Sequence, residues 1–240
     1  MQTEVRQIID PVLEAIDREL GAGYSAVVYG SAARGEFLDG LSDLNVLLVC
    51  DALRSDTLRR LGAGLLALRH RGQPFPLLFE RPEWDRVADV FPIEVADMQL
   101  AHEIVRGSDP VTGIRVQPED LRRCLEQELR GKLLRLRQVF AVHAAEPSAL
   151  GDVAVNTVSS IATLLRVALK LHGGVAAGDT PACLARAGAT LGVDSQVVVE
   201  LWARRRRPDQ TCSPEVFERY LSAVATAVRV MDQFTPGGET

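Results

Sequence analysis

The fold of this chain is decided by the stretch Val27-Val28-Tyr29-Gly30-Ser31-Ala32-Ala33-Arg34-Gly35. An apolar run that breaks at Gly-Ser predicts a buried strand ending in a tight turn, and the alanines after it can begin a helix whose free N–H groups face a phosphate. A second apolar stretch follows as Ser42-Asp43-Leu44-Asn45-Val46-Leu47-Leu48-Val49. Alternate side chains of a strand point the same way, so Asp43 and Asn45 are expected to project together toward the Gly-Ser turn.

These two stretches resemble the nucleotidyltransferase superfamily, which includes aminoglycoside-modifying nucleotidyltransferases, DNA polymerase beta and the minimal nucleotidyltransferases of toxin–antitoxin pairs. The pattern in that family is an apolar strand, Gly-Ser, three residues, Gly, and then Asp-any-Asp at the start of another apolar strand. The positions that match in identity and spacing are Gly30, Ser31, Arg34, Gly35 and Asp43. Asn45 stands where the family has its second aspartate.

The resemblance implies a nucleotide site that uses magnesium. The residues it assigns to binding the nucleoside triphosphate are Gly30, Ser31, Arg34 and Gly35. It assigns Asp43 and Asn45 to the catalytic metal position, where oxygen ligands hold Mg²⁺. Asn45 can offer such an oxygen but carries no negative charge, so the attraction for the metal is weakened.

A third carboxylate is expected, because the family carries one on a neighbouring strand. The third apolar stretch, 76–79, contains no acidic residue, and Glu80 ends it. We take Glu94 as the candidate general base, because some aminoglycoside enzymes use a glutamate in that role. Glu80 is the reserve base and the candidate third metal ligand. The simpler interpretation of each glutamate is a surface carboxylate, since glutamate is rarely buried without a partner.

Each part of the motif also has a simpler interpretation. Gly30-Ser31 could be only a tight turn, Arg34 a solvated helix residue, and Ser42 with Asp43 a pair that closes a turn. Their agreement in order, spacing and strand context favours a present or ancestral nucleotide site.

Three functions are open for such a site. The first is an enzyme that moves a nucleoside monophosphate from a magnesium-bound triphosphate to a hydroxyl of a small molecule or protein. The second is a catalytically degenerate relative that binds nucleotide and regulates, and the third is a fold retained for partner binding. Asn45 favours the second function, whereas the intact remainder of the motif opposes the third.

The composition limits which binding partners and which cellular compartment are expected for the protein. The chain has 240 residues, a net charge of −5 and a pI near 5.5, so it lacks a basic field for a nucleic-acid backbone, and no nucleic-acid partner is expected. The four cysteines form no Cys-x-x-Cys unit and predict neither zinc nor disulfides. The N-terminus lacks a signal-peptide pattern, and the apolar segment 153–171 contains charged residues, so a cytoplasmic protein without a membrane span is expected. A homodimer is left open.

The order of apolar patterns predicts an α/β nucleotidyltransferase domain over 1–115 and an all-α helical bundle over 116–240. In the first domain, helices are expected at 3–20, 53–70 and 84–90, and strands at 25–29, 44–50, 76–79 and 104–105. This alternation indicates a small mixed sheet packed on helices. After the turn-rich segment 107–113 every pattern is helical, beginning with a long helix at Pro118 and continuing at Thr180-Pro181 and Ser213-Pro214.

Overall fold

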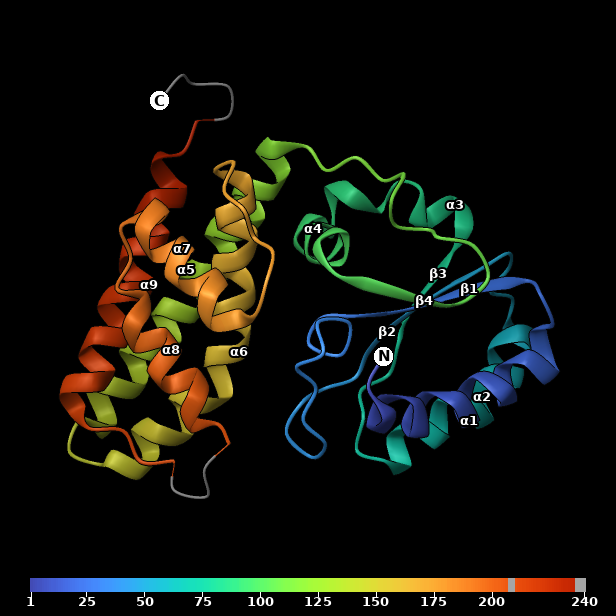
Figure 1. Cartoon of the computed structure of the whole chain (residues 1–240), viewed down its shortest axis with the longest axis horizontal. Coiled ribbons are helices and arrows are strands. Elements are labelled where there is room, and N and C mark those ends of the chain that lie inside the picture. The colour runs from blue at the N-terminus through green and yellow to red at the C-terminus, as the bar shows by residue number, and fades with distance from the viewer. Residues whose placement is uncertain (207–209, 236–240) are drawn as a thin grey trace. The chain divides into compact units, whose positions relative to one another are not determined.

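The computed structural model of the chain describes residues 1–206 and 210–235. They form two compact units, Met1–Val116 and Gln117–Thr240. The first unit holds a four-stranded sheet with flanking helices, and the second is built of helices (Figure 1). The predicted fold class, an α/β part followed by a helical bundle, is therefore confirmed.

The sheet of the first unit is mixed. In chain order the elements are α1 (Thr3–Leu20), β1 (Tyr24–Tyr29), β2 (Asn45–Cys50), α2 (Ser55–His70), β3 (Leu77–Glu80), α3 (Arg81–Trp84), the 3-10 helix η1 (Val87–Asp89), α4 (Pro92–Leu100) and β4 (His102–Arg106). The strands lie in the order β3-β2-β1-β4. β1 is antiparallel to β2 and β4, whereas β2 is parallel to β3. α2 makes the crossover that two parallel strands need.

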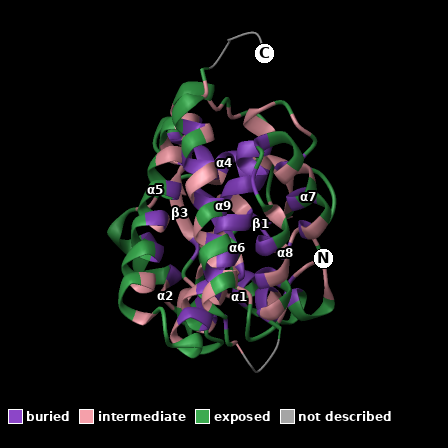
Figure 2. Cartoon of the chain, turned by 90° about the vertical axis from the view of Figure 1, so that its left-hand side faces the viewer, coloured by how far each residue is buried: buried purple, intermediate pink, exposed green. Residues whose placement is uncertain are grey.

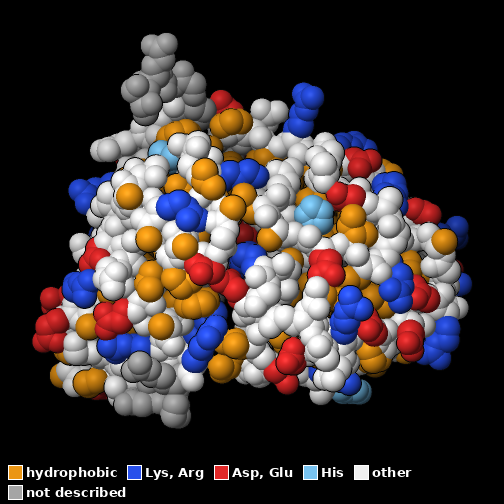
Figure 3. All heavy atoms as spheres, in the orientation of Figure 1, with side chains coloured by type: hydrophobic (Ala, Val, Ile, Leu, Met, Phe, Trp, Pro, Cys, Tyr) orange, Lys and Arg blue, Asp and Glu red, His pale blue; other side chains and the backbone are white. Residues whose placement is uncertain are grey.

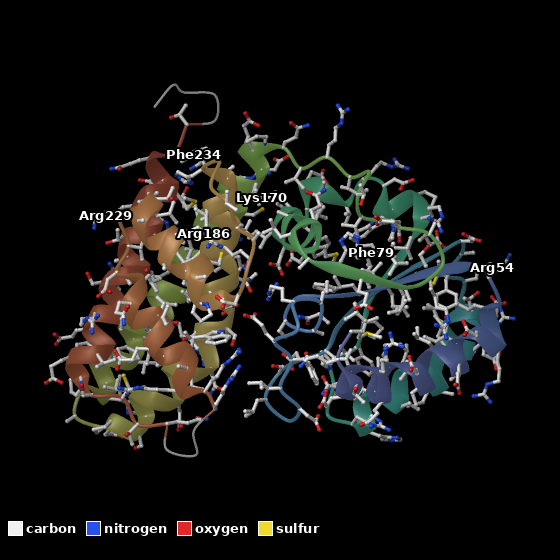
Figure 4. All side chains as sticks on the ribbon, viewed as in Figure 1. Arg54, Phe79, Lys170, Arg186, Arg229 and Phe234 are labelled. Carbon is white, nitrogen blue, oxygen red and sulfur yellow. The ribbon has the colours of Figure 1, made fainter. Side chains whose placement is uncertain are left out.

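Both faces of the sheet are buried, because the two central strands are apolar on each side. One face shares a buried cluster with α1 and α2, and the other shares a cluster with Trp84 and with α4. Figure 1 shows α1 and α2 on one face and α3 and α4 on the other. Phe79 of β3 lies on the second face (Figure 4), with its ring centroid 5.4 Å from that of Trp84 and 5.7 Å from that of Phe91. This second face is the one that bears the candidate site.

The second unit is a bundle around α6. Its helices are α5 (Pro118–His143), α6 (Pro147–Leu171), α7 (Thr180–Leu191), α8 (Ser195–Arg204) and α9 (Pro214–Gln233). α6 contacts each of the other four, and buried and exposed residues alternate along the helices (Figure 2). By length and composition, α6 alone among the described helices is apolar enough to cross a membrane, but 56% of its most apolar window is buried. That burial fits the core helix of a bundle.

Most predicted elements of the first unit agree with the structure within two residues, and three local predictions are wrong. No helix follows Gly-Ser, because 31–35 forms a turn. The helix expected at 84–90 is replaced by two short helices. The first, α3, begins earlier, at Arg81, and has Pro82 in its first turn, and the second is the separate η1. α4 was not predicted, since this short helix is apolar on nearly all sides and gives little periodic signal.

Candidate functional site

The candidate site lies at the ends of the two central strands, where β1 ends and β2 begins. We call this end of the sheet the sheet edge. Tyr29, the last residue of β1, pairs directly with Asn45, the first residue of β2. Gly30 follows with a φ of +72°, and a Cβ atom added there would lie 2.9 Å from Asn45 Nδ2. Glycine is thus required at position 30 by its backbone conformation and by the close approach of the Asn45 amide.

Asp43 and Asn45 occupy the same face of the chain. Leu44 is buried in the cluster of α1 and α2 together with Val46, and its N–H donates to Gln73 Oε1 at 2.7 Å. The residues that alternate with these two therefore belong to the opposite face. Asp43 is exposed and Asn45 is half-buried, and Asn45 lies beside Gly30 at the start of β2.

The turn after Gly30 leaves several backbone donors unused. Its hydrogen bonds run from Arg34 N to Gly30 O at 3.2 Å, from Gly35 N to Ala32 O at 3.3 Å and from Glu36 N to Ser31 O at 2.8 Å. With Gly35 at a φ of +74°, the last two bonds form a Schellman ending after a single helical turn. Within the described residues, the N–H groups of Ser31, Ala32 and Ala33 donate to no backbone acceptor. Such a group of N–H donors is suited to an anion.

Arg34 turns toward carboxylates rather than toward solvent. Its Nε lies 3.4 Å from Glu36 Oε2 and its guanidinium nitrogen NH1 lies 3.4 Å from Asp97 Oδ1. The exposed fractions of the three side chains are 12%, 11% and 7%. Asp97 belongs to α4 and was missed by the sequence reasoning. A signal was available, because Glu94 and Asp97 are three residues apart in a mostly apolar segment that begins with a proline.

Glu94 lies on the same side of the sheet. It sits in the first turn of α4, one helical turn before Asp97. Burial raises the pKa of the Tyr29 phenol, and the negative charges of Glu94 and then Asp97 raise it further. The ion pair of Asp97 with Arg34 places α4 against the turn after Gly30, and Glu94 belongs to the same helix. The phenol keeps its proton and stays a hydrogen-bond donor at neutral pH.

Glu80 lies at the other end of β2, which argues against its role as a metal ligand. In the parallel pairing of β2 and β3, Glu80 is opposite Cys50, five residues along the strand from Asn45. This separation corresponds to about 16 Å at ~3.3 Å per residue. The Glu80 side chain instead caps α3 and accepts a hydrogen bond from Leu53 N at 2.7 Å. The error arose because the sequence does not reveal the register of β3.

The donor set fits magnesium only in part. Within residues 1–206 and 210–235, no group of three or more His, Cys, Asp or Glu residues could hold a metal ion. Asp43 and Asn45 offer one carboxylate and one amide oxygen. Because Mg²⁺ usually keeps several waters and takes other oxygens from substrate phosphates, this pair suits an ion that arrives with a triphosphate. It does not form a closed metal cage.

Comparison with known proteins places the fold. No family model and no curated protein sequence matches the chain. Among solved structures, it is similar to spectinomycin adenyltransferase AAD(9) from Enterococcus faecialis, determined with ATP and spectinomycin, at a TM-score of 0.60 and 10% sequence identity. The chain shares the fold of that enzyme. The similarity covers 95% of this chain and 99% of the other, so it extends over both the sheet and the bundle.

Proposed function

We propose that this chain binds a magnesium-bound nucleoside triphosphate at the sheet edge and transfers a nucleoside monophosphate to a hydroxyl of a small molecule or protein. The observation that carries the proposal is the packing of Asn45 against Gly30, which brings the Gly-Ser turn to the start of β2, two residues after Asp43. The shared fold with an adenyltransferase supports it.

The turn supplies the phosphate contacts in this proposal. Gly30 lets the backbone approach the triphosphate, and the N–H groups of Ser31, Ala32 and Ala33 point at its oxygens. Asp43 and the Asn45 side-chain oxygen would hold magnesium. Bound there, the ion would neutralise charge on the triphosphate and on the leaving pyrophosphate.

Glu94 is the proposed general base. The acceptor hydroxyl attacks the α-phosphorus, the bond from that phosphorus to the oxygen bridging to the β-phosphate breaks, and pyrophosphate leaves. Glu94 takes the proton from the hydroxyl, since it lies on α4 one helical turn before Asp97 and its negative charge acts on Tyr29, the strand partner of Asn45. The Tyr29 phenol can donate a hydrogen bond beside it.

A small-molecule or protein acceptor is preferred over a nucleic acid. On the face in Figure 3, acidic and basic side chains are interspersed, with no single basic area, and the net charge of the chain is −5. The crystal structure of the similar enzyme, spectinomycin adenyltransferase AAD(9), contains ATP and spectinomycin, which are a nucleotide and a small molecule. We further propose a cytoplasmic location for the protein and leave a homodimer open.

A second candidate function rests on Asn45. An amide at this position gives the metal no charge, which favours a nucleotide-binding regulatory protein that does not turn over. Pyrophosphate release separates the two candidates, because the enzyme forms it in the presence of an acceptor and the regulator does not.

Replacing Asp43 with alanine tests the binding site itself. Wild-type protein should bind a non-hydrolysable ATP analogue more tightly with magnesium than without it, and Asp43→Ala should lose about tenfold or more of the magnesium-dependent affinity. Titration calorimetry with and without magnesium measures this. Glu80→Ala is the matched control, since it removes a carboxylate at the far end of β2 and should leave the affinity unchanged. Equal binding of the magnesium complex by Asp43→Ala and wild type would show that Asp43 holds no metal.

A further inference from the structure

Arg34 and Asp97 join two segments that lie far apart in the sequence. Arg34 closes the turn that offers N–H groups to the phosphates, and Asp97 lies on α4, one helical turn after Glu94. The turn is held on its other side by burial of Ala32, which is 1% exposed, and of Phe37, which is 4% exposed, in the core with α1 and α2. Arg34 NH1 lies 3.4 Å from Asp97 Oδ1, so this ion pair links the turn to α4.

The burial of this ion pair limits how Arg34 can act. Arg34 has an exposed side-chain fraction of 12%, and Asp97 has one of 7%. An arginine that bound phosphate directly would have to give up its mostly buried ion pair with Asp97, which is unfavourable. The planar guanidinium instead spans Glu36 within its own segment and Asp97 across to α4.

We infer that Arg34 is a positioning residue, which through Asp97 fixes the Gly30–Gly35 turn relative to the helix that carries Glu94. In this arrangement the phosphate contacts come from the backbone of the turn, and the arginine sets the distance between these contacts and the candidate base. The inference rests on the proposed function. It moves Arg34 from contact with the nucleotide to support of the residues that make that contact.

A double-mutant cycle tests the inference through nucleotide affinity. The variants are Arg34→Gln, Asp97→Asn and the double variant, with calorimetry using the magnesium complex of a non-hydrolysable ATP analogue. Each single variant should weaken nucleotide binding by about fivefold to tenfold. The double variant should weaken it by about the same factor, because all three variants lose the same Arg34–Asp97 ion pair. Glu36→Gln is the matched control. It removes the other carboxylate from the same arginine but keeps the link to α4, so its affinity should stay within about twofold of wild type.

Direct phosphate binding by Arg34 gives a different pattern. In that case Asp97→Asn leaves the affinity unchanged or tightens it, since the arginine is released from a carboxylate, and either result overturns the inference. The inference is also overturned if the affinity losses of the two single variants multiply in the double variant.

If thermal unfolding shows that a variant does not fold, Arg34→Lys serves in its place, because an ammonium keeps the charge but cannot span both carboxylates. Wild-type affinity in Arg34→Lys then contradicts a positioning role for Arg34. Wild-type protein that binds no nucleotide refutes the proposed function and the inference together, whereas normal wild-type binding with unaffected variants refutes the inference alone.

Discussion

Replacing Gly30 with alanine should lower both the stability of the protein and its affinity for nucleotide. The residue has a φ of +72°, and the added Cβ would lie 2.9 Å from Asn45 Nδ2. The positive φ costs an alanine about 1–2 kcal/mol, and the crowding adds to it, for a total of about 2–4 kcal/mol in the free energy of unfolding. Because Asn45 must move, magnesium-dependent nucleotide binding should fall by about tenfold or more.

Gly35→Ala is the matched control for this prediction. Its φ is +74°, but an added Cβ would meet nothing within 4 Å, so only the conformational cost of about 1–2 kcal/mol is expected. Adding Asn45→Ala to Gly30→Ala should restore the part of the stability lost to crowding. Urea unfolding measures each free energy. If Gly30→Ala and Gly35→Ala cost the same, the amide does not pack against Gly30.

The sheet edge could be predicted from the sequence because it depends on local alternation. Asp43 and Asn45 are two residues apart, and the apolar Leu44 and Val46 between and after them set which face is buried. The Gly-Ser break marked the end of β1 for the same reason. These features depend only on residues that are close in the sequence. For this reason the strands expected from the sequence agree with β1 and β2 of the structure.

The contacts made by Arg34 and Glu80 could not be predicted in this way. The partner of Arg34 lies 63 residues further on, on a helix without a periodic signal. The position of Glu80 depends on the register of β3 against β2, which is set by the length of α2 and its connections. The turn after Gly30 was misjudged because Ala-rich residues favour helix, whereas Gly35 at a positive φ ends the helical turn at once.

Replacing Asn45 with aspartate should strengthen magnesium binding and activity. Asparagine and aspartate are nearly isosteric, so the packing against Gly30 is kept. In the absence of metal, a second carboxylate beside Asp43 raises the pKa of one of the two acids and lowers the stability. Magnesium with triphosphate should reverse that loss, since a ligand that binds only the folded state at 100 times its dissociation constant adds about 2.7 kcal/mol of stability.

The charge argument can be separated from the geometry by exchanging the two residues. Asp43→Asn with Asn45→Asp keeps one carboxylate in the pair, so it should show none of the gain in magnesium stabilisation that Asn45→Asp alone shows. Thermal unfolding with and without magnesium and triphosphate measures the stabilisation, and pyrophosphate release, expected to rise by about tenfold or more in Asn45→Asp, measures turnover. The two readouts also decide between the enzyme and the regulator, because a wild type that binds magnesium and triphosphate without releasing pyrophosphate is limited by its amide. An Asn45→Asp variant that gains no magnesium stabilisation over wild type would mean that position 45 does not face the metal, and the assignment of Asp43 and Asn45 to one metal site would be wrong.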